Sequence, residues 1–288
     1  MRLQATHITK YLYAEAVSTC QTEVRLVPRV RSGQVPLSHH FDIVPSPSYS
    51  SSREDYFGNE VTSFSIEQPH QELVIASECL TDLEPAPPPN LNLSPAWEEV
   101  QEEVSRRATP ESFDAFQFIY ESPLIRRGPD FAAYAKESFE QGRRFLDGVN
   151  NLSERIFKEF HYDPKATTVA TPVEDALKAR RGVCQDFAHV MIACLRSLNL
   201  PARYVSGYIR SGSELAGGDA SHAWVSVWCP VFGWQDFDPT NKVMPQADHI
   251  TLAWGRDYSD VAPVKGVALG GGEQVIRVSV KVVEAEED

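Results

Sequence analysis

Three residues in the second half of the chain have the side chains that amide-bond chemistry needs: a thiol, an imidazole and a carboxylate. The thiol is Cys184, which follows Gly182 and precedes a run of apolar residues at helical spacing that ends before Pro201. This pattern predicts a helix whose first turn contains Cys184. Unpaired backbone N–H groups and the helix dipole stabilise a thiolate there, and the thiolate is the nucleophilic form of cysteine.

The imidazole and the carboxylate are expected on neighbouring strands. Three stretches rich in strand-forming residues follow the helix, at residues 202–209, 221–228 and 234–238. Only a short turn separates the last two, which predicts an antiparallel hairpin. In such a hairpin, Asp238 at the end of one strand lies next to His222 at the start of the other.

Together these groups could perform acyl transfer. The imidazole takes the proton from sulfur and later returns one to the leaving amine, and the carboxylate fixes the imidazole tautomer. Each residue also has a structural interpretation: Cys184 as a small core residue, His222 as a hydrogen-bonded core histidine, and Asp238 as the start of a turn. Their combination on one helix and one hairpin favours the catalytic interpretation.

Further evidence comes from three segments, which are Gly182–His189, Asp219–Trp224 and Asp238–Asn241. They closely resemble the transglutaminase-like superfamily, and in particular its bacterial members that are described as candidate cysteine proteases. The resemblance covers about residues 152–264, and residues 1–65 look like the additional N-terminal domain of this branch. By this resemblance Cys184 is the nucleophile, His222 the general base and Asp238 the orienting acid.

The resemblance implies acyl transfer at an amide or peptide bond through a thioester, with no metal or organic cofactor. Cys184 attacks the carbonyl, ammonia or an amine leaves, and water or another amine resolves the acyl-enzyme. Hydrolysis by a peptidase or amidase is the first hypothesis, transamidation of glutamine by amines the second, and a catalytically silent binding module the third. The sequence does not separate the first two, because both use the same acyl-enzyme. The expected partner is a peptide or protein amide substrate.

Several neighbours of the predicted nucleophile are candidates for the same site. The backbone N–H of Cys184 is expected to bind the oxyanion. By the resemblance, Tyr162 is a candidate second donor, with a strand-edge or core position as the alternative. Gln185, Trp224 and Tyr258 are candidates for lining the cleft, and ordinary loop packing is the alternative for Tyr258.

Two polar residues of the predicted helix are expected to point away from the thiol. Asp186 lies two residues after Cys184 and is interpreted as a structural first-turn acid that pairs with Arg181 or Arg203. His189 lies five residues after Cys184, so a metal site built from these two residues is not expected.

The overall composition excludes several classes of function. The 288 residues carry a formal net charge of −13 and no basic stripe, which argues against a nucleic-acid partner. No apolar stretch reaches membrane-span length, and Met1–His7 lacks the apolar core of a signal peptide. The five cysteines are odd in number and unclustered, as expected for reduced thiols in the cytoplasm. The sequence does not indicate an oligomeric state.

The chain is expected to be of the α+β class with two domains. Short β patterns separated by turns predict an N-terminal β-sandwich over residues 1–84. The proline-rich residues 85–95 indicate a stiff linker. Residues 96–288 are expected to form a papain-like, transglutaminase-like catalytic domain, with the Cys184 helix packed on an antiparallel sheet.

Two local patterns add detail to this organisation. Ser94 is expected to be the N-cap of the first helix, with Pro95 at its first position. Val275–Val283 alternates between apolar and polar residues and is expected to be a last strand of the catalytic domain.

Overall fold

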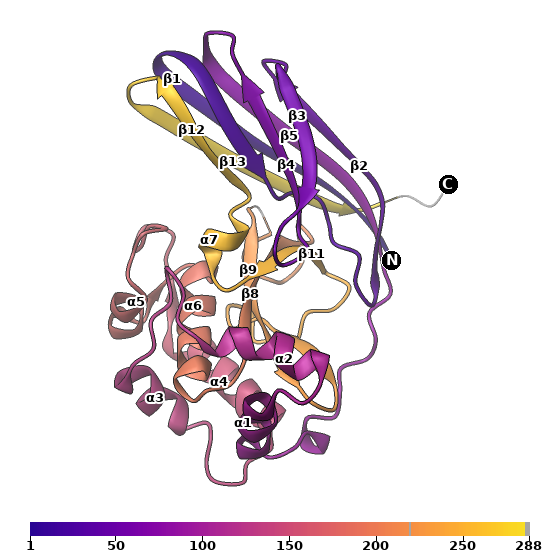
Figure 1. Ribbon diagram of the computed structural model, residues 1–288, viewed down its shortest axis with the longest axis vertical. Coiled ribbons are helices and arrows are strands. Elements are labelled where there is room, and N and C mark those ends of the chain that lie inside the picture. The colour runs from indigo at the N-terminus through magenta and orange to yellow at the C-terminus, as the bar shows by residue number, and fades with distance from the viewer. Residues whose placement is uncertain (219, 286–288) are drawn as a thin grey trace.

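The computed structural model describes residues 1–218 and 220–285 and has the expected α+β architecture (Figure 1). One antiparallel sheet lies at one end of the molecule, and helices with a second, smaller antiparallel sheet lie at the other. The first sheet contains β1 (Arg2–Val24), β2 (Gln34–Val44), β3 (Tyr49–Glu54), β4 (Glu60–Ile66), β5 (His70–Leu83), β12 (Val264–Gly270) and β13 (Gln274–Glu284). The second contains β8 (Ala202–Ile209), β9 (His222–Cys229), β10 (Gly233–Phe237) and β11 (His249–Gly255), in the order β10-β9-β8-β11.

The first sheet is antiparallel and long in the strand direction. At most positions across it, two consecutive strands lie end to end, with a break between them near the middle. β1 pairs along one side with β5 and β4 and along the other with β13 and β12. β2 and β3 pair in the same way with β5 and β4. The register of β1 against β5 shifts between Leu12 and Val17, close to these interruptions. Such irregularities bend strands, which explains why the sheet curls.

This curled sheet differs from the expected β-sandwich, because its strands form one sheet and not two stacked ones. It also takes strands from both ends of the described chain. β12 and β13 pair with β1, so that Leu3 lies opposite Glu284. The predicted strand Val275–Val283 is therefore present, but it belongs to the first sheet. The domain boundaries near residues 84 and 96 stay a prediction.

The helices gather around one central helix, α6. They are α1 (Trp97–Arg106), α2 (Pro110–Phe116), α3 (Pro129–Lys136), α4 (Phe145–Glu159), α5 (Val173–Ala179), α6 (Cys184–Ser197) and α7 (Tyr258–Val261). Most residues of α6 are buried, and Ala223 and Val225 of β9 belong to the same apolar cluster as the helix. No helix in the described part of the chain is long and apolar enough to cross a membrane.

The first of these helices starts later than the sequence predicts. α1 begins at Trp97 with Ala96 as its N-cap, so the predicted cap at Ser94 is wrong. The Ser94 hydroxyl instead accepts the backbone N–H of Leu146 in the first turn of α4, at 3.0 Å. Ser94 thus satisfies one of the free N–H groups of α4 from outside that helix.

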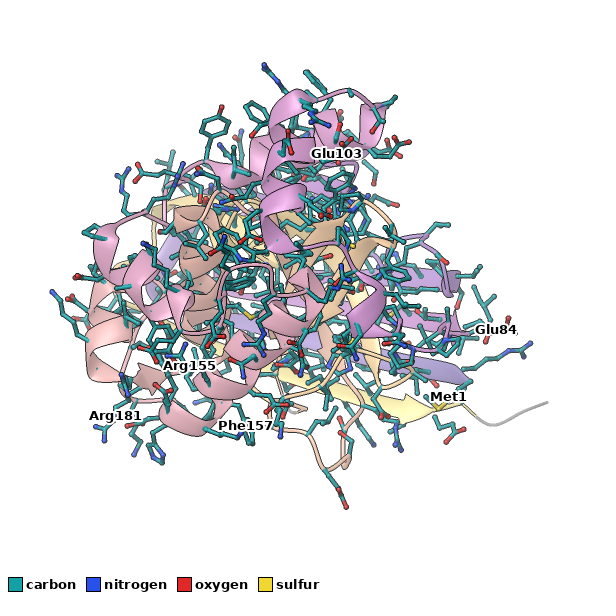
Figure 2. The ribbon with its side chains drawn as sticks, turned by 90° about the horizontal axis from the view of Figure 1, so that it is seen from below. Met1, Glu84, Glu103, Arg155, Phe157 and Arg181 are labelled. Atoms are coloured by element: carbon teal, nitrogen blue, oxygen red, sulfur yellow. The ribbon has the colours of Figure 1, made fainter. Side chains whose placement is uncertain are left out.

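The second sheet lies between α6 and the first sheet. Its outer side contributes Tyr208, Ile250 and Leu252 to the apolar core of the first sheet. A buried hydrogen bond of 2.9 Å joins the Tyr208 hydroxyl to Nδ1 of His7 on β1. Figure 2 shows Met1, where β1 begins, on the opposite flank of the molecule from Arg181, which precedes α6.

Candidate active site

The start of α6 places Cys184 at a partly exposed position. The Asp186 carboxylate folds back over this turn, where its Oδ2 accepts the backbone N–H of Val183 at 2.8 Å and the hydroxyl of Thr167 at 2.7 Å. Glycine fits at position 182 because a Cβ there would lie 2.4 Å from Asp186 Oδ2. The other four cysteines, all within the described residues, are buried. Cys184 is therefore the thiol that a substrate can reach.

The expected pairing of Asp186 with an arginine is wrong. Arg181 lies 3.7 Å from Asp163, and the guanidinium of Arg203 stacks 4.0 Å from the ring centre of Trp234. Asp186 is instead an internal cap of α6. Burial raises the pKa of its carboxyl, although its hydrogen bonds to the Thr167 hydroxyl and the Val183 N–H oppose this shift.

His222 and Asp238 meet at the end of the β9–β10 hairpin. His222 is the first residue of β9, and Asp238 directly follows β10, which pairs antiparallel with β9. His222 Nε2 lies 2.8 Å from Asp238 Oδ2, and both side chains are fully buried. Because Asp238 occupies Nε2, Nδ1 is the ring nitrogen that remains for proton exchange with another group.

Cys184 lies beside this imidazole. Burial alone lowers the pKa of His222, but the charges of Asp238 and Cys184 and the hydrogen bond to Asp238 outweigh burial and raise that pKa to about 10. The loop before β9 also approaches the ring closely, since a Cβ on Gly217 would lie 2.6 Å from Nδ1. The surroundings therefore favour a protonated imidazole next to the sulfur.

The Asp238 carboxylate is held by several donors besides His222. Its Oδ1 accepts the backbone N–H groups of Thr240 and Asn241 at 2.8 and 3.3 Å, and its Oδ2 accepts the Asn241 side-chain amide at 2.7 Å. His249 Nε2 lies 3.4 Å from the same Oδ2. Burial alone raises the pKa of Asp238, but attraction to His222 and hydrogen bonds from both histidines hold it well below its usual range.

His249 is the site residue that sequence reasoning missed. It opens β11, an unpredicted strand at the opposite edge of the sheet from β10, so its approach to Asp238 depends on the curl of the sheet. No local sequence pattern signals such a contact. His222, Asp238 and His249 could also offer three ligand atoms to a metal ion, all within 4.8 Å of one another. Their present hydrogen bonds already satisfy the carboxylate without one.

Tyr162 lies close to the thiol. It belongs to the short strand β6 (His161–Tyr162), which pairs in parallel with β7 (Arg181–Gly182), just before Cys184. Burial and the nearby charge of Cys184 raise the pKa of Tyr162 to about 12. The hydroxyl therefore stays protonated and able to donate, and Tyr162 remains a candidate oxyanion donor at a strand position.

Of the other predicted cleft residues, Gln185 lies in the first turn of α6 and Tyr258 lies on α7 beside that helix. Tyr258 is half-buried at the start of α7, and its backbone N–H donates to His189 Nε2 at 3.2 Å. Gln185 is buried, and its amide donates to the carbonyl of Val169 at 3.4 Å. These contacts leave their cleft-lining role as a prediction.

Trp224 does not fit the predicted position in the cleft wall, because it is fully buried. Its ring packs nearly parallel to that of His222, with 6.2 Å between centres, and edge-on to His249 at 5.2 Å. Gly207 makes this possible, since a Cβ there would lie 2.4 Å from the Trp224 ring. Trp224 is therefore a buried residue that packs against the rings of His222 and His249.

The fold and the site define a transglutaminase-like protein, in which a helix that begins with cysteine packs on strands that bring a histidine and an aspartate together. Residues 132–239 match the transglutaminase-like superfamily, and residues 3–82 match the bacterial transglutaminase-like N-terminal region. The chain belongs to this superfamily and has the N-terminal region of its bacterial branch.

Relatives of similar length share the whole chain. An uncharacterized protein of Mycobacterium tuberculosis is 36% identical over 297 residues, which cover 100% of this chain and 94% of the relative. One from Mycobacterium leprae is 32% identical over 286 residues and covers 98% of both chains. Among solved structures, a candidate cysteine protease from Cytophaga hutchinsonii aligns with a TM-score of 0.78 at 19% identity, over 100% of this chain and 92% of that one. This last likeness shows the fold.

Proposed function

We propose that the protein is a cysteine-dependent hydrolase of amide or peptide bonds. Cys184 gives its proton to His222 and attacks the carbonyl carbon, so that a carbon–sulfur bond forms. The carbon–nitrogen bond then breaks, and the amine leaves with a proton from His222. Water, deprotonated by His222, releases the acid and restores the thiol. Asp238 keeps the imidazole oriented throughout.

The observation that supports this proposal most is the buried His222–Asp238 pair beside the one unburied thiol. The two side chains lie 2.8 Å apart and are fully buried, and removing such a pair from water costs free energy, so it is not expected of a histidine with only a packing role. Next to Cys184, the same pair stabilises the imidazolium that forms when sulfur loses its proton. The backbone N–H of Cys184 and the hydroxyl of Tyr162 are the proposed oxyanion donors.

Hydrolysis and transamidation differ only in whether water or an amine reaches the acyl-enzyme. We favour hydrolysis because the structurally similar protein from Cytophaga hutchinsonii is described as a candidate cysteine protease. Incubation with a glutamine peptide and a labelled amine separates the two. Release of ammonia or cleaved peptide without labelled product supports hydrolysis, whereas incorporation of the amine supports transfer.

The first prediction concerns the thiol itself. Iodoacetamide should alkylate Cys184 at pH 6 at least about tenfold faster than it alkylates glutathione, because the neighbouring imidazolium stabilises the thiolate. Peptide mapping by mass spectrometry identifies the site. His222→Gln should remove this advantage, and Cys184→Ala should abolish peptide or amide turnover.

Cys194→Ala is the matched control, since Cys194 lies on the same helix but is fully buried. This variant should keep both the alkylation rate of Cys184 and the turnover. Equal alkylation of Cys184 in the unmodified protein and in His222→Gln would contradict the proposed function.

We also propose that the protein works in a reducing compartment such as the cytoplasm. All five cysteines are free thiols. A thiol nucleophile is kept reactive by such surroundings.

A further inference from the structure

The connection between β1 and β2, residues 25–33, lies against an edge strand of the second sheet. At its end, the Gln34 amide donates to the carbonyl of Thr251 on β11 at 2.8 Å, and the Thr251 N–H donates back to Gln34 Oε1 at 2.8 Å. The backbone N–H of Arg29 reaches the same carbonyl at 3.1 Å. One backbone hydrogen bond from Arg29 and two side-chain hydrogen bonds of Gln34 therefore hold this part of the chain against Thr251.

Arg31 in this connection joins the two edge strands of the second sheet. Its Nη1 donates to Asp236 Oδ2 on β10 at 2.6 Å and to Thr251 Oγ1 on β11 at 2.9 Å. β10 and β11 stand at opposite edges of the sheet, so the sheet must curl strongly to bring them together. The Asp236 side chain is 7% exposed and that of Arg31 25%, so this ion pair is largely shielded from water.

A second cross-link lies one step further, just after β10 ends and where β11 begins. It is the contact of 3.4 Å between Asp238 Oδ2 and His249 Nε2. Asp238 lies two residues after Asp236, and His249 lies two residues before Thr251. Residues two apart along a strand point to the same side, so the two cross-links are neighbours that close the same curl.

These cross-links add long-range contacts to the local hydrogen bonds of the Asp238 carboxylate. Thr240 and Asn241 orient the carboxylate, but they belong to the same turn as Asp238 and move with it. Arg31 reaches β10 from a segment that is distant in sequence. It therefore connects the strand before this turn to β11, in addition to the pairing of β10 with β9.

We propose that Arg31 is a positioning residue for the triad: by holding Asp236 against Thr251, it sets the place of Asp238 and therefore of His222. This inference rests on the proposed function, because the place of Asp238 matters to catalysis only if His222 serves Cys184. It gives the N-terminal part of the chain a role inside the active site, without any contact to the reacting atoms.

The test is the ring proton of His222 that faces Asp238. In a buried histidine–carboxylate pair, this proton gives a far-downfield proton resonance that exchanges slowly with water. We expect this resonance in the unmodified full chain, and its loss in Asp238→Ala assigns it. In Arg31→Met, which keeps the length of the side chain but not its charge, the proton should exchange at least about tenfold faster, and Cys184 alkylation should slow by a similar factor. Arg31→Lys should restore part of both.

Arg53→Met is the matched control, since Arg53 forms an exposed ion pair of 2.8 Å with Glu23 in the first sheet. It should leave the resonance and the alkylation rate unchanged. If Arg31→Met does not fold, Asp236→Asn removes the same ion pair from the other side. An unchanged resonance in the folded variant, or no such resonance in the unmodified protein, would overturn the inference.

This readout is separate from the proposed function. The resonance reports the His222–Asp238 geometry whether or not the protein turns over a substrate. The proposed function fails instead if Cys184 reacts no faster than it does in His222→Gln. The resonance without fast alkylation of Cys184 would therefore contradict the enzymatic proposal. Arg31→Met would still test whether Arg31 sets the position of Asp238.

Discussion

At the scale of single residues, the site depends on a carboxylate that stays charged although it is buried. Asp238 accepts hydrogen bonds from two backbone N–H groups, from the Asn241 amide and from His222. This number of donors offsets the cost of removing a charge from water. Against the opposing effect of burial, this charge and that of Cys184 raise the pKa of His222 to about 10.

Asp238→Asn tests this electrostatic coupling. The amide has nearly the same shape but no charge, so turnover should fall by about 10²- to 10⁴-fold. In the proposed mechanism His222 must be protonated to release the amine, so activity should be lost as pH rises through its pKa. Without the carboxylate charge this pKa falls, and the alkaline limb of the rate profile should move to lower pH.

Rates measured between pH 5 and 10.5 on the same substrate check both effects. Asp248→Asn is the control, because Asp248 lies near His249 but pairs at the surface with Arg210 at 2.5 Å. It should change neither the rate nor the profile. An alkaline limb that stays in place in Asp238→Asn would show that the carboxylate does not act on His222.

At the scale of elements, the important one is the first turn of α6. The Asp186 carboxylate occupies the space next to position 182 and caps the N–H of Val183. The same turn presents Cys184 to His222. The backbone around Cys184 therefore depends on a residue without a side chain at position 182.

Gly182→Ala should disturb this turn. The added Cβ would lie 2.4 Å from Asp186 Oδ2, so the cap must move, and we expect a loss of about 2 kcal/mol in the free energy of unfolding. Urea unfolding measures this loss, and alkylation of Cys184 should slow in the folded fraction. Gly128→Ala is the control, because its Cβ would meet only Phe131, at 3.8 Å. An equal loss in both variants would contradict the steric argument.

The sequence predicts those elements that local patterns define. The helix that begins at Cys184 and the β9–β10 hairpin follow from apolar spacing and from one short turn, and the α+β class is confirmed. β11 and β12 were not predicted, and the β-sandwich was expected where one curled sheet exists. Their positions depend on pairing between distant segments, which leaves no local pattern. His249 was missed for the same reason.

At the scale of the whole molecule, two buried histidines form hydrogen bonds between different strands and helices. His7 links β1 to β8 through the Tyr208 hydroxyl at 2.9 Å, and His189 on α6 accepts the N–H of Tyr258 on α7 at 3.2 Å. Burial lowers the pKa of each from 6.5 to about 4. Protonation of either would place a charge inside an apolar core.

Acid should therefore destabilise the fold well above pH 4. Between pH 6.5 and about 4 the unfolded chain binds protons at these histidines and the folded chain does not, so stability falls as pH falls through this window. His7→Gln can keep the hydrogen bonds but does not titrate. Between pH 7 and pH 4.5 it should lose about 2 kcal/mol less than the unmodified protein.

Urea unfolding at the two pH values measures this difference. His161→Gln is the control, because His161 is exposed on β6. Its loss between the two pH values should equal that of the unmodified protein. An equal loss in His7→Gln would show that His7 does not contribute to the acid sensitivity.

The pairing of β1 with β12 and β13 has a consequence for biosynthesis. The segment Arg2–Val24 leaves the ribosome before its partners on one side, up to Glu284, which emerge only after the helices and the second sheet have been made. Until then one flank of β1 has free N–H and carbonyl groups, which can attract other nascent chains. A chain released before residue 264 would keep that flank open and would be an early target for chaperones and proteases.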